Sequence, residues 1–131
     1  MRKEFCGVMK MPKLTTIIVP AYNESLVIGR TLTNLAKLER ITPLQIIVAC
    51  NGCSDSTAEI AKDFNVNVIE IEKAGKIGAL NAACQMILGD IVVFLDADLI
   101  VSPSDILDLI NAINHTTCKL ALGTMQVDVT K

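Results

Sequence analysis

The chain has 131 residues, a length that allows one domain with its own hydrophobic core but hardly two. Its hydrophobic fraction is 51%, of which aromatic residues contribute little, so aliphatic side chains supply the core, as in parallel strands buried on both faces. The 12 basic and 14 acidic residues give a net charge of -2, which excludes the broad positive field of a nucleic-acid-binding protein.

The apolar runs are far shorter than the roughly 20 residues that a membrane-spanning helix needs. Charged residues interrupt the stretch after Arg2, so a signal peptide is not expected. The five cysteines are an odd number without dense spacing, which indicates reduced thiols and a cytoplasmic location, with contact at the inner face of a membrane left open. We expect residues 1–13 to be an N-terminal extension and residues 14–131 to form the domain.

Short β-branched runs alternate with amphipathic segments from residue 14 onward, which is the pattern of repeated βαβ units. In chain order, we expect strands at 14–20, 45–50, 66–71 and 91–95, and a fifth at 119–124 that residues 125–129 could extend. Helices are expected between them. The first has Ile28, Leu32 and Leu35 on one face, and the others run from Ser56 toward Phe64, over 76–88 and from Ser102 to about Asn114.

Local signals set several of these boundaries. Pro20 cannot donate to a strand ladder and is expected to end the first strand. Ser56 with Glu59 forms a capping-box signal. Ser102 is expected to be the N-cap of a later helix, because Pro103 follows at N1 and the acidic Asp105 follows at N3. Gly89 is expected to close the preceding helix in the left-handed conformation. The elements together predict a three-layer α/β/α fold with a mostly parallel, Rossmann-like sheet.

Polar residues follow each of the first four predicted strands, in the loops that lead to the next helix. These loops contain residues 21–24, 50–55, 73–76 and 96–98. Because ligands of open parallel sheets bind beyond the carboxyl ends of the strands, we expect the four loops to form one site.

Asp96 and Asp98 follow an apolar strand and would repel each other if left bare, a penalty that a divalent cation removes. Carboxylate oxygens favour Mg²⁺ or Mn²⁺, and substrate phosphates and water usually complete the coordination shell, so a diphosphate ligand is implied. Lys76 could neutralise the same phosphates, and Tyr22 offers an aromatic face on which a base could stack.

Four segments resemble, in order and spacing, the motifs of family 2 glycosyltransferases, which have the GT-A fold. They are Val19–Glu24, Asn51–Thr57, Lys76–Asn81 and Asp96–Asp98, and the agreement extends from about residue 14 to the end of the chain. The resemblance implies an inverting, metal-assisted transfer of a sugar from a nucleoside diphosphate sugar to a hydroxyl group of a glycan, lipid or other acceptor.

The resemblance also implies a donor site, whose expected nucleotide-sugar-binding residues are Pro20, Tyr22, Glu24, Asn51, Asp55, Lys76 and Asp96. The first three would hold the nucleoside, the lysine would hold the phosphates, and Asp96 would hold the ribose or sugar. Asp98 would bind Mg²⁺ or Mn²⁺, and Asp96 and Asp98 are the candidate catalytic residues. A general base that deprotonates the acceptor is expected downstream of this chain.

The chain departs from the family pattern in two ways. Cys50 stands where the family usually places an aspartate that reads the base, and a thiol accepts hydrogen bonds weakly, so a UDP-sugar is not singled out. Complete members continue into an acceptor-binding half, so we expect a chain truncated at its C-terminus, whose partner would be a second copy or a separate acceptor-binding chain.

Other interpretations remain beside this one. The chain could be a non-catalytic remnant that binds nucleotide and metal, or a haloacid-dehalogenase-like phosphotransferase with Asp96 as nucleophile, although that motif usually follows the first strand of its fold. Cys50 and Cys53 form a Cys-x-x-Cys motif. A redox or zinc site is disfavoured there because the predicted helix cap comes later, at Ser56, and a second pair of zinc ligands is missing.

Overall fold

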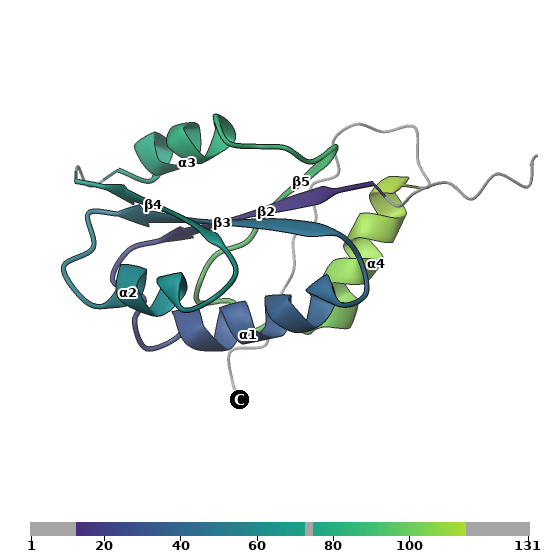
Figure 1. The fold of residues 1–131 in the computed structure, drawn as a ribbon, viewed down its shortest axis with the longest axis horizontal. Helices are drawn as coiled ribbons and strands as arrows, with labels where there is room; N and C mark the ends of the chain where they lie inside the picture. Colours follow the sequence, from purple (N-terminus) through teal and green to yellow (C-terminus); the bar gives the residue numbers. More distant parts are fainter. Residues whose placement is uncertain (1–12, 73–74, 115–131) are drawn as a thin grey trace, which may run out of the picture.

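The computed structural model describes residues 13–72 and 75–114, which form a sheet between helical layers (Figure 1). The elements are β2 (Thr15–Ala21), α1 (Ile28–Glu39), β3 (Leu44–Asn51), α2 (Thr57–Lys62), β4 (Asn67–Ile71), α3 (Lys76–Cys84), β5 (Ile91–Phe94) and α4 (Pro103–Asn114). The strand predicted at 119–124, its extension and nearly all of the predicted N-terminal extension lie outside the described residues. The predicted α/β fold with a parallel sheet is confirmed.

The four strands of the described sheet are parallel and lie in the order β4-β3-β2-β5. From β2 the chain adds β3 and β4 on one side, and it then returns to place β5 on the other side. Thr15 of β2 pairs with Ile91, and Ile18 pairs with Phe94. The direction of winding therefore reverses between β2 and β5, which is the position where open α/β sheets bind their ligands.

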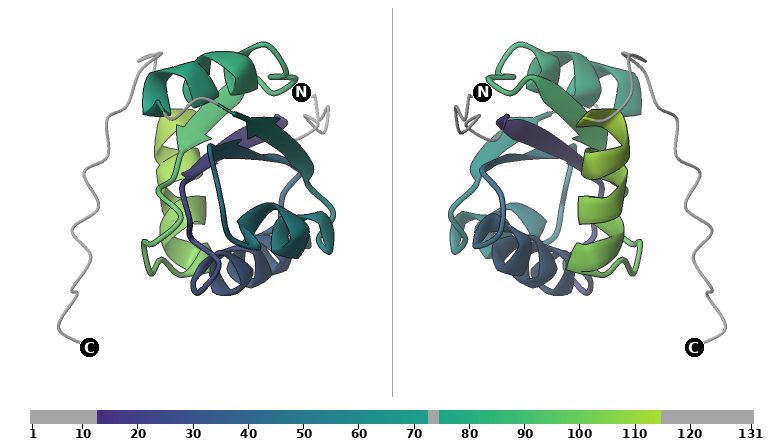
Figure 2. Two further views of the ribbon diagram at one scale, coloured as in Figure 1. Left: turned by 90° about the vertical axis from the view of Figure 1, so that its left-hand side faces the viewer. Right: turned by 90° about the vertical axis from the view of Figure 1, so that its right-hand side faces the viewer.

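Successive residues of the strands face opposite helical layers, as the two-residue period of a strand requires. Ile17 and Val19 belong to the buried cluster shared with α1, α2 and α4, whereas Ile18 packs with Ala79 and Ala83 of α3. Figure 2 shows α3 over one face of the sheet and α1 and α2 over the other. The sheet is thus buried on both faces, which explains the aliphatic composition.

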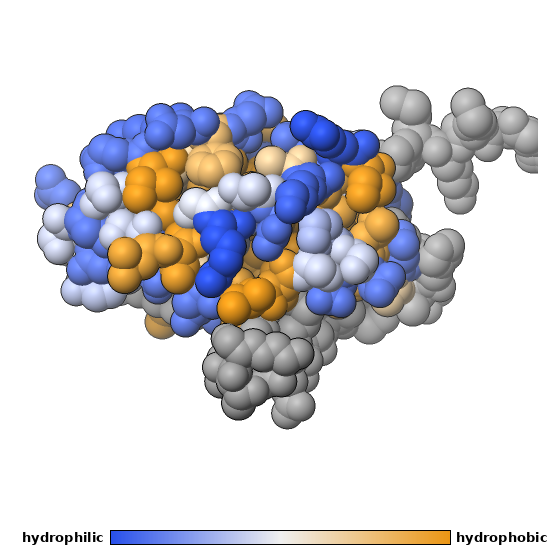
Figure 3. Space-filling view, turned by 90° about the horizontal axis from the view of Figure 1, so that it is seen from below, coloured by the Kyte–Doolittle hydropathy of each residue, from blue (hydrophilic) through white to orange (hydrophobic). Residues whose placement is uncertain are grey.

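The surface on the side of α1 and α2 mixes apolar and hydrophilic areas, as the view from below shows (Figure 3). The described large apolar side chains that are exposed come from several different elements, and they are Leu26, Ile41, Ile77, Met86, Leu88, Phe94 and Ile100. Among the described helices, none has the length and apolar character needed to cross a bilayer.

Several predicted boundaries differ from the structure near the ends of elements. β2 continues through Pro20 to Ala21, because the ladder with β5 stops at Ile18 and the missing N–H of the proline leaves no bond unmade there. α2 ends at Lys62 and does not reach Phe64.

The helix predicted at 76–88 ends earlier, at Cys84. The side chain of Gln45 on β3 donates to the carbonyl oxygen of Met86 at 2.8 Å and accepts the N–H of Leu88 at 2.9 Å. These main-chain groups are therefore bonded to the sheet and not to a further helical turn.

Gly89 does not have the left-handed conformation predicted for it, whereas Asn23 and Gly52 do, with φ of 49° and 60°. Its N–H donates to the hydroxyl of Thr16 at 2.9 Å, and a Cβ at this position would lie 2.6 Å from the same oxygen. A glycine is required here because the chain passes close to β2, and not because a helix ends.

The two predicted helix caps have different outcomes. Ser102 Oγ accepts the N–H of Asp105 at 3.2 Å, so the predicted N-cap of α4 is confirmed. Ser56 makes no side-chain cap bond at α2, and Asp55 Oδ1 instead accepts the N–H of Thr57 at 3.0 Å. The capping box predicted for α2 is wrong because a carboxylate one residue earlier bonds the helix start.

Candidate functional site

A cavity of about 270 Å³ opens beyond the carboxyl ends of β2, β3 and β5. We call it the donor-edge cavity, and its lining residues are Pro20, Ala21, Tyr22, Glu24, Asn51, Asp96, Ala97 and Asp98. Six of the eight predicted site residues line it and Asp55 does not, while the side chain of Lys76 lies outside the described part of the structure. The cavity lies where the winding of the sheet reverses.

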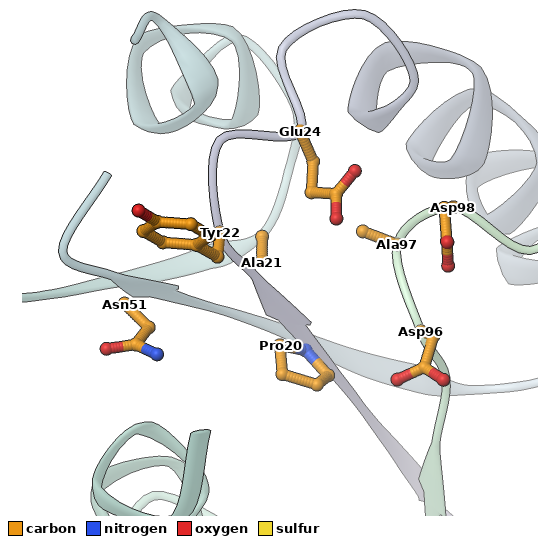
Figure 4. A pocket seen from close by; sticks show the side chains of 8 residues that line it. All are labelled: Pro20, Ala21, Tyr22, Glu24, Asn51, Asp96, Ala97 and Asp98. Carbon is orange, nitrogen blue, oxygen red and sulfur yellow. The ribbon is translucent and has the colours of Figure 1, made fainter. Parts of the chain in front are cut away.

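Two kinds of side chain lie on opposite sides of the donor-edge cavity (Figure 4). The carboxyl groups of Glu24, Asp96 and Asp98 occupy one side, and Tyr22 and Asn51 occupy the other. Tyr22 is 55% exposed, so its ring is accessible to a planar ligand. One wall therefore suits a cation, and the other suits the planar base of a nucleotide.

The side of the cavity that carries Glu24, Asp96 and Asp98, which we call the acidic wall, concentrates negative charge. Burial raises the pKa of Glu24, and the negative charges of Asp98, Asp55 and Asp96 raise it further. A cation would relieve this repulsion. In residues 13–72 and 75–114, no group of three or more His, Cys, Asp or Glu is arranged to hold an ion by itself. The residues fit Mg²⁺ or Mn²⁺ bound by one or two carboxylates together with ligand phosphates and water.

The loop of Asp96 and Asp98 is anchored to α1 by its main chain. Thr31 is buried, and its hydroxyl donates to the carbonyl oxygen of Ala97 at 2.7 Å. Arg30 donates to the carbonyl oxygen of Asp98 at 3.4 Å, and Asn34 donates to a carbonyl three residues later at 3.3 Å. These donors were not predicted from the sequence, although a polar residue such as Thr31 among apolar helix positions is a signal for them.

The loop after β2 is bound to the loop after β3 through Asn23. The Oδ1 atom of Asn23 accepts the N–H groups of Ser54 at 2.8 Å and Asp55 at 3.3 Å. Asparagine tolerates the left-handed backbone that places this oxygen, so the residue suits its position. We call the contacts between residues 21–25 and 53–57 the loop clamp.

Asp55 supplies further bonds of the loop clamp. Its carboxylate accepts the N–H of Ser25 at 3.2 Å, and it also accepts the hydroxyl of Thr57, which in turn accepts the N–H of Glu24 at 2.9 Å. Hydrogen bonds from Thr57, followed by those from Ser25, lower the pKa of Asp55 to about 2. Asp55 therefore shapes the wall that carries Glu24, although it is not part of the cavity lining.

The end of β3 turns Asn51, and not Cys50, toward the donor-edge cavity. Cys50 is buried and lines a second cavity. Asn51 Oδ1 accepts the N–H of Gly75 at 2.7 Å, and its amide nitrogen points toward the donor-edge cavity (Figure 4). Lys76, next to Gly75, is the first residue of α3.

The sequence and the fold match known proteins. A family described as Glycosyl transferase family 2 matches residues 16–129. The glycosyltransferase AglD of Haloferax volcanii is 29% identical over 119 residues, which cover 83% of this chain and 19% of AglD.

Two solved structures have similar folds. Glucosyl-3-phosphoglycerate synthase from Mycobacterium tuberculosis, in complex with Mn²⁺, UDP and glucosyl-3-phosphoglycerate, aligns with a TM-score of 0.71 and 25% identity over 80% of this chain and 41% of its own. Mannosyltransferase PcManGT from Pyrobaculum calidifontis, in complex with GDP-Man and Mn²⁺, aligns with a TM-score of 0.68 and 30% identity over 79% of this chain and 32% of its own. The chain thus spans less than half of each of these proteins.

Proposed function

Because the chain belongs to glycosyl transferase family 2, we propose that it is the donor-binding part of an enzyme that transfers a sugar from a nucleoside diphosphate sugar to an acceptor hydroxyl with inversion. The observation that carries the proposal is the donor-edge cavity, in which an acidic wall faces Tyr22 and Asn51 at the switch point of a parallel sheet.

In the proposed donor complex, the base stacks on the exposed ring of Tyr22, near Pro20. The amide nitrogen of Asn51 can donate to the nucleoside, since its oxygen already accepts the N–H of Gly75. Asp96 binds the ribose or the sugar. Lys76 binds the phosphates, because it begins a helix at the same edge of the sheet.

We propose that Asp98 is the main protein ligand for Mg²⁺ or Mn²⁺, on the acidic wall shared with Asp96 and Glu24. When bound, the ion would neutralise the charge that develops on the departing diphosphate. The side chains of Thr31 and Arg30 donate to main-chain carbonyls of the loop and so hold the backbone that carries these carboxylates. Carboxylates on a preorganised loop lose little conformational freedom when the donor binds, which lowers the entropic cost of binding.

The acceptor and the general base are proposed to lie outside this chain's described residues, on an acceptor-binding half, a second copy or a separate chain. A cytoplasmic enzyme acting on a glycan, lipid or other hydroxyl acceptor is part of the same proposal. A non-catalytic remnant that binds nucleotide and metal is the alternative to this proposal. The family match argues against the phosphotransferase with Asp96 as nucleophile.

Calorimetric titration of UDP, GDP and CDP, each with and without Mn²⁺, tests the proposal. We expect at least one nucleotide to bind in a metal-dependent way, and Asp98→Ala to weaken that binding by more than about tenfold. Asp108→Ala is the matched control, because Asp108 is an exposed acid on α4 that does not line the donor-edge cavity. Binding that ignores Mn²⁺, or an equal effect of the two variants, would overturn the donor site.

A second measurement separates an enzyme from a remnant. Radiolabelled UDP-glucose and GDP-mannose are incubated with the chain and Mn²⁺, and release or transfer of the sugar is followed by chromatography. Release above the level of Asp98→Ala supports catalysis. Metal-dependent binding without any release favours the remnant.

A further inference from the structure

A second cavity, of about 530 Å³, lies on the other side of the end of β3 from the donor-edge cavity. Its lining consists of Cys50, Gly52, Cys53, Glu70, Ile71 and Glu72. Both cysteines are free thiols, Cys50 is buried and Cys53 is partly exposed. Both thiols line the same cavity, and Cys53 is near enough to Cys50 to be one of the groups that raise its pKa. An open cavity therefore gives small molecules access to the partly exposed Cys53, with the buried Cys50 in the same lining.

The thiol of Cys53 is also a member of the loop clamp. It accepts the N–H of Asn23 at 3.4 Å and donates to the carbonyl oxygen of Ala21 at 3.4 Å. Ala21 and Asn23 flank Tyr22, the aromatic residue of the donor-edge cavity. The same sulfur atom thus lies in the lining of the second cavity beside Cys50 and bonds the main chain on both sides of Tyr22.

We propose that Cys50 and Cys53 are a reversible disulfide site whose oxidation loosens the loop clamp and weakens donor binding. The consequence for binding rests on the proposed function, whereas formation of the disulfide does not. The oxidant is a small-molecule disulfide of the glutathione type, which enters through the second cavity.

The reaction proceeds by thiol–disulfide exchange. The Cys53 thiolate attacks a sulfur of the small-molecule disulfide, so that a mixed disulfide forms and one small thiol leaves. Cys50 then loses its proton and attacks the sulfur of Cys53, and the second small thiol leaves with the electron pair of the broken bond. Two protein thiols are oxidised, and one small disulfide is reduced to two thiols.

The surroundings set the order of these two steps. Burial, followed by the neighbouring Cys53, raises the pKa of Cys50 to about 12, so Cys50 stays protonated at neutral pH. Cys53 is the more exposed thiol and meets the oxidant first. Once Cys53 is in the mixed disulfide it carries no thiolate charge, which removes its part of the rise in the pKa of Cys50.

Oxidation changes the loop clamp in a defined way. A disulfide sulfur carries no proton, so the bond that Cys53 donates to Ala21 is lost. The sulfur also turns toward Cys50, which weakens its contact with Asn23. We expect the wall that carries Tyr22 to become less well fixed and the affinity for the nucleotide to fall about fivefold.

The test uses the full chain with Cys6, Cys84 and Cys118 changed to serine, so that Cys50 and Cys53 are the remaining cysteines. Oxidised glutathione is added, and thiol counting with mass spectrometry follows the product. We expect both thiols to disappear without a bound glutathione, and dithiothreitol to restore them. Persistence of both thiols, or a stable glutathione adduct alone, would overturn the proposal.

Calorimetry of UDP, GDP and CDP with Mn²⁺ then compares the reduced and oxidised chain. Cys53→Ser keeps a donor and an acceptor at the same place, so it should bind nucleotide like the reduced chain and ignore the oxidant. Cys53→Ala has neither group and should bind weakly in both conditions. If the disulfide forms but the nucleotide affinity is unchanged, the proposed effect of oxidation on donor binding is refuted. Loss of all nucleotide binding in the reduced chain contradicts the proposed function instead.

Discussion

The two loops that form the walls of the donor-edge cavity are held in opposite ways. In the loop clamp, side chains such as Asn23 and Asp55 bond the main chain of a neighbouring loop. In the loop of Asp96 and Asp98, the main chain is bonded by side chains of α1, among them Thr31. The first arrangement uses the polar side chains of the loops for structure. The second places the anchoring bonds on main-chain carbonyl groups of the loop.

Thr31→Val should have the largest effect, because it removes the buried donor to Ala97 and leaves the carbonyl unsatisfied. We expect a loss of about 1–3 kcal/mol in the free energy of unfolding. If the anchoring also positions the carboxylates, the affinity for Mn²⁺ with nucleotide falls about tenfold. Urea unfolding and calorimetry measure the two quantities.

Thr33→Val is the matched control on the same helix. The hydroxyl of Thr33 is exposed and bonds the carbonyl oxygen of Gly29 within α1, so its loss should change stability by less than about 0.5 kcal/mol. Thr31→Ser should recover the binding of Mn²⁺ with nucleotide. Equal affinity of the Thr31→Val and Thr33→Val variants for Mn²⁺ with nucleotide would show that the bond to Ala97 does not position the carboxylates of the loop.

Asn23→Ala tests the loop clamp and should have the next largest effect. It removes the oxygen that accepts the N–H groups of Ser54 and Asp55, and it places alanine at a φ of 49°. We expect a loss of about 1–2 kcal/mol in the free energy of unfolding. Asn23→Gly removes the same bonds without the backbone penalty, so it should lose less. If Asn23→Gly lowers the free energy of unfolding more than Asn23→Ala does, the loss reflects the conformational entropy of the unfolded chain and not the missing bonds of the loop clamp.

The pH dependence of stability should report Asp55. Its pKa is lowered from 3.8 to about 2, so its bonds stabilise the fold above pH 3.8 and are lost as the pH falls through 2. Asp55→Asn should therefore be less stable than the unchanged chain at pH 6 and approach it near pH 2. Denaturant unfolding at both pH values measures the difference. A constant difference would mean that the charge of Asp55 contributes nothing to the clamp.

Glu24→Gln should have the smallest effect, and it has the opposite sign. The raised pKa of Glu24 means that its ionised form is disfavoured in the folded chain, a cost that is absent at low pH and grows as the pH rises through the raised pKa. We expect the variant to gain up to about 0.5 kcal/mol at pH 7 and nothing at pH 4. Because Mn²⁺ would offset the same repulsion, the gain should shrink when the ion and a nucleotide are added.

Much of the fold and of the cavity could be predicted from the sequence because both depend on simple periodicity. Alternating strands and helices imply a parallel sheet, and the carboxyl ends of its strands meet at one edge. For that reason residues as far apart in sequence as Tyr22 and Asp98 could be expected in one place. Their roles in binding stay predictions.

The contacts between loops could not be predicted in the same way. The role of Asp55 in donor binding stays a prediction, whereas the bonds of its carboxylate to Ser25 and Thr57 were not predicted. Gly89 was expected to end a helix, yet it allows the chain to pass close to Thr16. Both outcomes depend on which segments come together in three dimensions, and the spacing of residues along the chain does not contain that information.

The position of β5 has a consequence for how the chain folds. Thr15 at the start of β2 pairs with Ile91, so the sheet is completed only when the chain closes a long loop, which is a slow and non-local step. β2, β3 and β4 can associate earlier, but the acidic wall lacks Asp96 and Asp98 until β5 joins them. A nucleotide that requires this wall would bind only the completed sheet and would lengthen its lifetime by mass action. The ligand would then act as a reporter of the last folding step.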